Sequence, residues 1–169
     1  VAQAYHPGQG VYRSSYQNAM RMARTEINSA YREADSIRWQ QLDFIVGYEV
    51  KTSKSHVQWL AKFWYPRFKK GRAPLEICDA MEGKYPKSFK FIGWHPNCKC
   101  HAVPIIANEG TDRDFWEEPL NEVKDVPDNF KRWVEDNTER IEKAKNLPYF
   151  IGENKKHFND SLFINRDAV

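Results

Sequence analysis

Three cysteines and one histidine lie close together in the middle of the chain, and their side chains could bind a metal ion. Cys78 precedes the segment 94–100, which reads WHPNCKC. Thiolates and imidazole are the ligands of structural, tetrahedral zinc sites. The proline after the histidine restricts the turn, and alternate residues of an extended chain point to the same side. The sequence therefore predicts a zinc site formed by Cys78, His95, Cys98 and Cys100.

Two other states of the cysteines fit the same pattern. Cys-x-Cys is a less standard zinc motif than Cys-x-x-Cys, so reduced, half-buried thiols with His95 hydrogen-bonded in the turn are an alternative. A disulfide is a third alternative, although three clustered cysteines favour a reducing compartment. Further residues could complete or replace a ligand, and nothing local selects among them: His56, Glu76, Asp79 and His101.

The sequence lacks the local signatures of several common enzyme sites. Residues 7–10 (PGQG) lack the Lys-Ser/Thr of a phosphate-binding loop, and neither Gly-x-Ser-x-Gly nor His-Glu-x-x-His occurs. A thiolate-rich ligand set suits a closed structural site better than a hydrolytic zinc site, which keeps a water ligand. We therefore expect a structural protein, not an enzyme, without a small-molecule substrate.

The longest periodic pattern predicts a helix over about 13–41. Apolar residues recur there at alternating steps of four and three: Tyr16, Met20, Ala23, Ile27, Ala30, Ala34 and Ile37. This heptad-like spacing indicates that the apolar face packs against a neighbour. Arginines follow one flank, and we predict that Arg21, Arg24 and Arg32 contact an acidic partner; a solvated helix with internal ion pairs fits the same pattern.

Shorter patterns predict the remaining elements and an α+β fold. We expect a strand over 44–51, a helix over 56–64, extended segments at 88–92 and 100–106, and a helix from Pro127 to Leu147. The expected fold is a long N-terminal helix packed on a small irregular sheet with a Cys/His knuckle, plus a C-terminal helical extension. The expected division is an N-terminal segment 1–12, a main domain 13–106, a linker 107–126 and the extension 127–169.

The charge balance favours neither a nucleic-acid coat protein nor a membrane protein. The net charge is only +3, and no apolar run approaches the roughly 20 residues that span a bilayer. A locally basic stretch nevertheless allows a nucleic-acid-binding module, with Lys69, Lys70 and Arg72 on phosphates. The aromatic residues that would stack on bases lie among further lysines, including Lys87 and Lys90, and are Tyr85, Phe89, Phe91 and Trp94. Candidate protein-contact residues are the aromatic side chains Trp59, Phe63, Trp64 and Trp116.

Three motifs follow one another along the chain: Arg24-Thr25-Glu26, Cys78 followed by Glu82-Gly83, and the turn from His95 to Cys100. In this order they resemble the phage Mu F-like head morphogenesis family, the minor head proteins of tailed bacteriophages. The match spans roughly 13–106. It departs from the family at Leu75, where many members have another cysteine.

The resemblance implies a structural component of the virion interior. Such a protein assembles in the bacterial host cytoplasm, contacts portal and capsid proteins, and assists head assembly and DNA packaging or delivery. An alternative is the non-catalytic delivery domain of a longer phage-associated toxin. The chain begins with Val1, so we expect a fragment or a processed product.

Overall fold

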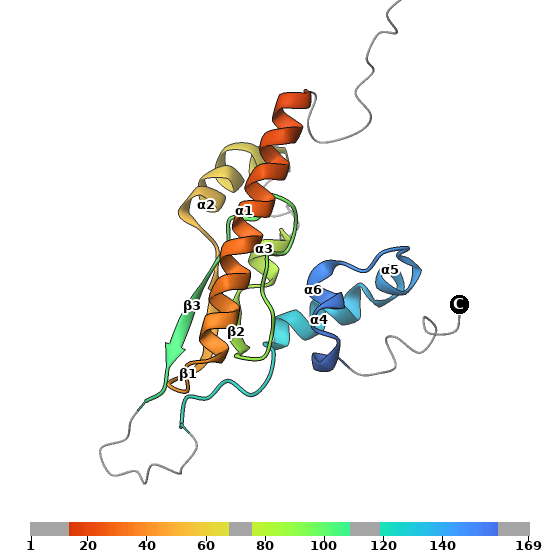
Figure 1. Cartoon of the computed structure of the whole chain (residues 1–169). Coiled ribbons are helices and arrows are strands. Elements are labelled where there is room, and N and C mark those ends of the chain that lie inside the picture. Colours follow the sequence, from red (N-terminus) through yellow and green to blue (C-terminus); the bar gives the residue numbers. More distant parts are fainter. Residues whose placement is uncertain (1–13, 68–75, 109–118, 159–169) are drawn as a thin grey trace, which may run out of the picture.

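The protein has a mixed helix and sheet fold, as the sequence predicts. The computed structural model describes residues 14–67, 76–108 and 119–158 (Figure 1). A long helix, α1 (Ser15–Gln40), crosses in front of a three-stranded sheet. Short helices lie between the first two strands and after the third strand. The Ser14 hydroxyl caps α1 by accepting a hydrogen bond from the Gln17 amide, which satisfies one of the free N–H groups of the first turn.

The sheet is antiparallel, with β1 (Ile45–Lys51) between β2 (Gly83–Pro86) and β3 (His101–Ile106). Tyr48 in β1 lies opposite Tyr85 in β2 and Pro104 in β3. All of β1 up to Val50 except Glu49 is buried, because β1 is paired on both edges. The two predicted strands over 44–51 and 100–106 are therefore confirmed.

Short helices complete the described chain. Helix α2 (Lys54–Trp59) continues into a π-helical turn (Leu60–Trp64) and a 3-10 turn (Tyr65–Arg67), which confirms the predicted helix over 56–64. Helix α3 (Ile77–Ala80) precedes β2. The C-terminal elements are α4 (Asp128–Asp136), α5 (Thr138–Lys143), α6 (Tyr149–Gly152) and a 3-10 turn (Lys155–His157).

The prediction of an extended strand at 88–92 is wrong. The strand of this region, β2, ends at Pro86, before the predicted segment. A turn follows β2, in which the Phe89 amide donates to the Pro86 carbonyl. Beyond it, side chains replace strand partners. The Tyr48 hydroxyl donates to the Phe89 carbonyl, and the Asn154 amide group bonds both the N–H and the C=O of Lys90. These backbone groups are satisfied without a strand partner, so the segment packs as a buried loop.

The single helix predicted from Pro127 to Leu147 is also wrong, because it breaks at Asn137. The Asn137 side chain donates to the Trp133 carbonyl, and its backbone leaves the helical region at φ −112° and ψ 9°. An asparagine side chain that bonds local backbone competes with helix continuation. Pro148, which follows the predicted helix, is the capping residue before α6.

The apolar face of α1 does not pack on the rest of the protein as predicted. Tyr16, Ile27 and Ile37 of this face are 74%, 55% and 56% exposed. The inward face is polar instead, and in α1 only Ser36 is fully buried. The sequence pattern identified the helix correctly but assigned the wrong face to the interior.

One aromatic core joins the sheet region to the C-terminal helices. Tyr85 and Phe89 of the sheet region contact Phe130 of α4 edge-on, with ring centroids 5.7 and 5.3 Å apart. Trp94 contacts Phe150 of α6 in the same way, at 5.4 Å. The boundary predicted at 107–126 therefore separates two segments that share one core.

Replacing Phe130 by alanine tests this shared core. The side chain is fully buried between the two segments, so we expect Phe130→Ala to lower the free energy of unfolding by about 3–5 kcal/mol. Hydrogen exchange should accelerate in β1 as well as in α4. The control is Leu120→Ala, at a residue that is 83% exposed, and it should be nearly neutral. Unchanged protection of β1 in the Phe130 variant would show that the segments unfold independently.

Candidate metal centre

Two segments distant in the sequence position the candidate ligands. Cys78 is the second residue of α3, whose N-terminus is capped by the Glu76 carboxylate accepting from the Cys78 amide at 3.0 Å. His95 and Cys98 lie in a turn closed by the Cys98 amide donating to the His95 carbonyl. Asn97 takes a left-handed backbone conformation there, with φ 60°, which asparagine tolerates better than most residues.

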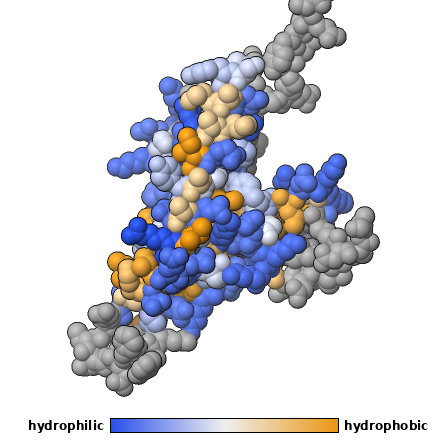
Figure 2. Space-filling view, viewed as in Figure 1, coloured by the Kyte–Doolittle hydropathy of each residue, from blue (hydrophilic) through white to orange (hydrophobic). Residues whose placement is uncertain are grey.

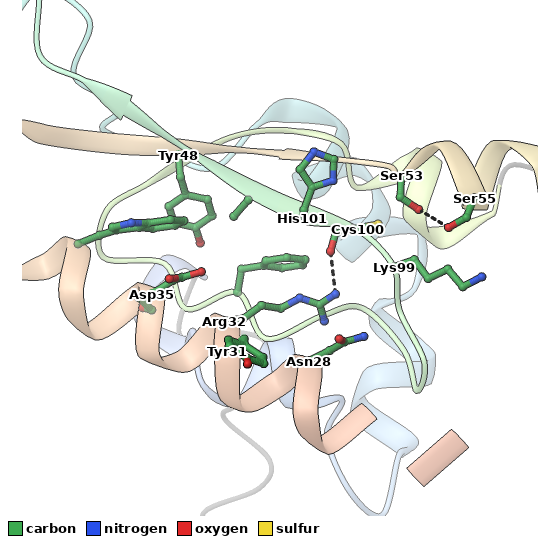
Figure 3. Close-up of a pocket in the computed structure, with 14 residues that line it drawn as sticks. Asn28, Tyr31, Arg32, Asp35, Tyr48, Ser53, Ser55, Lys99, Cys100 and His101 are labelled. Carbon is green, nitrogen blue, oxygen red and sulfur yellow. Dashed lines mark hydrogen bonds between the residues drawn. The ribbon is translucent and has the colours of Figure 1, made fainter. Parts of the chain in front are cut away.

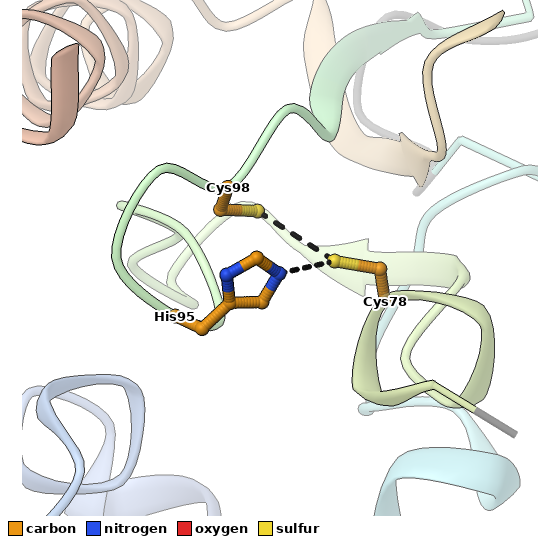
Figure 4. Close-up of side chains that lie close together, drawn as sticks. All are labelled: Cys78, His95 and Cys98. Carbon is orange, nitrogen blue, oxygen red and sulfur yellow. Dashed lines mark hydrogen bonds between the residues drawn. The ribbon is translucent and has the colours of Figure 1, made fainter. Parts of the chain in front are cut away.

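The side chains of Cys78, His95 and Cys98 converge on one point (Figure 4). The Cys78 Sγ lies 3.0 Å from His95 Nε2 and 3.9 Å from Cys98 Sγ. His95 Nδ1 lies 2.8 Å from the Pro96 carbonyl oxygen, which can only accept, so Nδ1 carries the proton and donates. Nε2 therefore faces Cys78 with its lone pair, the tautomer that a metal ligand needs.

The separations agree with tetrahedral coordination by sulfur and nitrogen. Zinc–sulfur bonds of about 2.3 Å and zinc–nitrogen bonds of about 2.0 Å place two sulfur ligands roughly 3.8 Å apart, and a sulfur and a nitrogen ligand roughly 3.5 Å apart, around one ion. The observed sulfur–sulfur distance of 3.9 Å is close to the expected one, and the observed sulfur–nitrogen distance of 3.0 Å is about 0.5 Å shorter than expected. Cys78, His95 and Cys98 could therefore hold a metal ion after a small outward movement of the imidazole.

Cys100, the fourth predicted ligand, is buried and interacts with the thiols of Cys78 and Cys98, but the close group that includes His95 does not contain it. The cysteines are free, so the disulfide alternative is not borne out. Contact with the thiols of Cys100 and then Cys78 lowers the pKa of Cys98, whereas contacts with Cys100 and Cys98 and burial raise the pKa of Cys78. The proximity of the thiols thus favours deprotonation of one of them.

A second group of polar side chains also includes Cys78. His56 is 7% exposed, and its Nε2 lies 3.3 Å from Asp79 Oδ1 and 3.8 Å from Glu76 Oε2, without a well-aligned hydrogen bond. Burial raises the pKa of Asp79, while the neighbouring His56 opposes that shift. His56, Glu76 and Cys78 form an alternative ligand group, whereas exposed His101 lies in β3 outside both groups.

Arg32 of α1 holds the cysteine turn through its backbone. The guanidinium donates to the carbonyls of Ile92, Cys98 and Cys100 at 2.9, 2.8 and 2.7 Å, and Figure 3 shows it reaching Cys100. Gly93 makes this approach possible, because a Cβ at that residue would lie 2.6 Å from Arg32 Nη1. Arg32 is therefore a structural residue of the turn, not the exposed partner contact that the sequence suggested.

Two more polar residues of α1 bond the same turn. The Thr25 hydroxyl accepts from the Asn97 amide at 2.8 Å, and the Asn28 side chain donates to the Cys98 carbonyl at 3.3 Å. Sequence reasoning missed both roles. The signal was present as polar residues at helical spacing opposite the apolar stripe: Thr25, Asn28, Arg32 and Ser36.

The turn and α1 also border a groove with a volume of about 450 Å³ (Figure 3). One wall is α1, with Asn28, Tyr31 and Asp35, and the other includes Lys99 and His101. Arg32 lies in this groove with its donors directed at carbonyl oxygens. The groove leaves one side of the cysteine turn open to solvent.

The other predicted contact residues are placed as follows. Arg24 is exposed on α1, and Arg21 is half-buried and bonds Asn18. Trp59 is 38% exposed. Lys69, Lys70, Arg72 and Trp116 lie outside the described residues, and the side chains of Phe63 and Trp64 are not described.

The aromatic residues proposed to stack on bases are core residues. Tyr85, Phe89, Phe91 and Trp94 are at most 3% exposed. Of the basic residues between them, Lys90 pairs with Glu33 and Glu153, and Lys87 donates to the Leu42 carbonyl. The stacking surface expected for a nucleic-acid-binding module is therefore not formed by these residues.

Comparison of the chain with known protein families, with curated proteins and with solved structures gives no match. In the described ranges, no helix has both the length and the apolar character required to cross a membrane.

Removing the Arg32 side chain tests its role in the turn. Because Arg32→Ala would remove a charged donor from three carbonyls, we expect a loss of about 2–4 kcal/mol in the free energy of unfolding, together with altered amide shifts at 92–100. Arg24→Ala, at an exposed residue of the same helix, is the matched control and should cost less than about 0.5 kcal/mol. Equal effects of the two substitutions would contradict the assignment.

Proposed function

We propose that the Cys/His cluster binds one structural zinc ion and that the protein is a structural component of a phage head. The observation that supports the first part is the convergence of Cys78, His95 and Cys98, two of them fully buried. Thiolates with an imidazole favour zinc over the hard cations, which prefer oxygen ligands. Cys100, which is buried and interacts with both thiols, is the fourth ligand that the sequence predicts.

A zinc ion here would contribute stability by cross-linking. It would tie α3 to the turn that precedes β3, two segments that are separate in the sequence. Metal binding to a site that exists only in the folded chain adds directly to folding free energy. A thiolate-rich, largely buried set is typical of a closed structural site, which supports a non-catalytic role.

The phage head assignment is supported by the way the three motifs meet. Thr25 of the first motif accepts from the Asn97 amide of the third, and Cys78 of the second contacts His95 and Cys98. Glu82 accepts from the Thr52 hydroxyl at 2.6 Å. Residues that are separate in sequence thus form one contact network, as a shared family fold would require.

Within this proposal the protein is a minor capsid protein of the virion interior that contacts portal and capsid proteins during assembly in the host cytoplasm. The delivery domain of a phage-associated toxin is the alternative, since such a domain would use the same non-catalytic fold. No small-molecule substrate is needed in either role.

Metal content tests the zinc centre. We expect about one zinc per chain in the purified protein. Cys98→Ser should lose most of the metal, because it removes one of the converging ligands. His56→Gln should keep it, because His56 belongs to the adjacent group. Elemental analysis gives the metal content, and circular dichroism verifies that each variant is folded.

Cobalt substitution of the unaltered protein keeps this test decisive if Cys98→Ser fails to fold. Thiolate-to-cobalt charge-transfer bands are expected in the near ultraviolet. Zinc loss in His56→Gln with retention in Cys98→Ser would assign the metal to His56, Glu76 and Cys78 instead.

Co-assembly tests the head assignment. Co-expression with the portal and capsid proteins of the encoding phage should yield heads that contain this chain in a few copies, measured by quantitative mass spectrometry. Portal protein should bind it in the absence of the capsid protein. Heads that exclude the chain, with no portal binding, would reject the assignment without affecting the zinc proposal.

A further inference from the structure

The exposed face of α1 has the composition of a coiled-coil seam. Written as a heptad, its core positions are Tyr16, Met20, Ala23, Ile27, Ala30, Ala34 and Ile37. Apart from Met20, which is half-buried, all of these residues are exposed. Figure 2 shows apolar atoms following the visible side of α1. The helix has 26 residues and extends for about 39 Å, enough for three heptads.

The contacts that α1 makes with the other described residues leave this seam free. The α1 residues that bond or pack on the rest of the described chain are Thr25, Asn28, Ser29, Arg32, Ser36 and Trp39, together with Glu33, which binds Lys90. In the same heptad all of them except Glu33 (position g) occupy positions b, c and f, which face away from the partner in a coiled coil. The seam therefore points outward, and a second helix could dock on it without displacing the sheet, the cysteine turn or the C-terminal helices.

The charges that flank the seam identify the partner and its direction. Glu26 and Glu33 lie on one flank (position g), and Arg24 and Arg38 lie on the other (position e). Two parallel copies in register would place Glu33 beside Arg38 of the other copy, twice by symmetry. Antiparallel copies would instead bring the two acidic flanks together, with Glu26 facing Glu33 of the other copy. Charges at e and g set the orientation of coiled coils.

We propose that the protein forms a homodimer through a parallel, in-register coiled coil of two α1 helices. Lys90 binds Glu33 at 2.7 Å and holds that carboxylate on the flank where the pairing occurs. In this dimer the sheet and C-terminal helices of each copy lie on the outer side of its own α1 helix. The metal centre and the groove of each copy therefore stay accessible. The surface is isologous, as a two-fold dimer requires.

Ile27→Asp tests the dimer, because it places a charge in the seam at an exposed residue without disturbing the core. Analytical ultracentrifugation from about 1 µM to about 1 mM covers the range in which a short coiled coil would dissociate. The unaltered chain should reach twice the monomer mass, Ile27→Asp should stay monomeric, and Leu120→Asp should dimerise like the unaltered chain. A monomer mass for the unaltered chain throughout this range would overturn the proposal, whether the seam is covered by another segment of the chain or left free.

Cross-linking and charge reversal test the orientation. Ile37→Cys should form an intermolecular disulfide under mild oxidation, because equal residues adjoin only in a parallel register. Arg38→Glu should weaken self-association at least tenfold, and mixing it with Glu33→Lys should restore dimers. Cross-linking only between Met20→Cys and Ile37→Cys chains would indicate an antiparallel pair and contradict the parallel dimer. Failure of portal binding would leave all of these readouts unchanged.

Discussion

The hydrogen bonds from Arg32 to three carbonyl oxygens fix the cysteine turn, and much of the structure depends on them. A loop can be buried only if its backbone polar groups find partners. Segment 88–100 has few strand-type partners, so side chains supply them: Arg32 and Asn28 from α1 and Asn154 after α6. The helix packs inward through polar contacts because the loop offers mainly carbonyls. Its apolar residues are consequently left on the outer face.

The same arrangement positions the metal centre. With the backbone of the turn held by α1, Cys98 and His95 are directed toward α3, where the Glu76 cap orients Cys78. Buried aromatic rings, including Tyr85, pack on the other side and link the centre to the C-terminal helices. The centre thus lies where three parts of the chain meet, and an ion bound there would stabilise all three.

Much of this could be predicted from the sequence, and the failures have physical causes. The heptad spacing of α1 and the apolar run of β1 are strong local signals, so both elements were found. The motif His95 to Cys100 predicted a cluster that the structure brings together for Cys78, His95 and Cys98. The inward face of α1 was missed because it is defined by carbonyls of a distant loop, which no local pattern reveals. The break at Asn137 and the loop at 88–92 depend on side-chain to backbone bonds that outweigh helix and strand preference.

X-ray absorption at the zinc edge of the purified protein tests the central claim most directly, because it reports which atoms surround the ion. The account predicts a first shell dominated by sulfur at about 2.3 Å with one nitrogen at about 2.0 Å, as expected for Cys78, Cys98 and Cys100 with His95. A shell of only nitrogen and oxygen, or a protein that purifies without metal and keeps its fold in a strong chelator, would contradict a structural zinc centre at this turn.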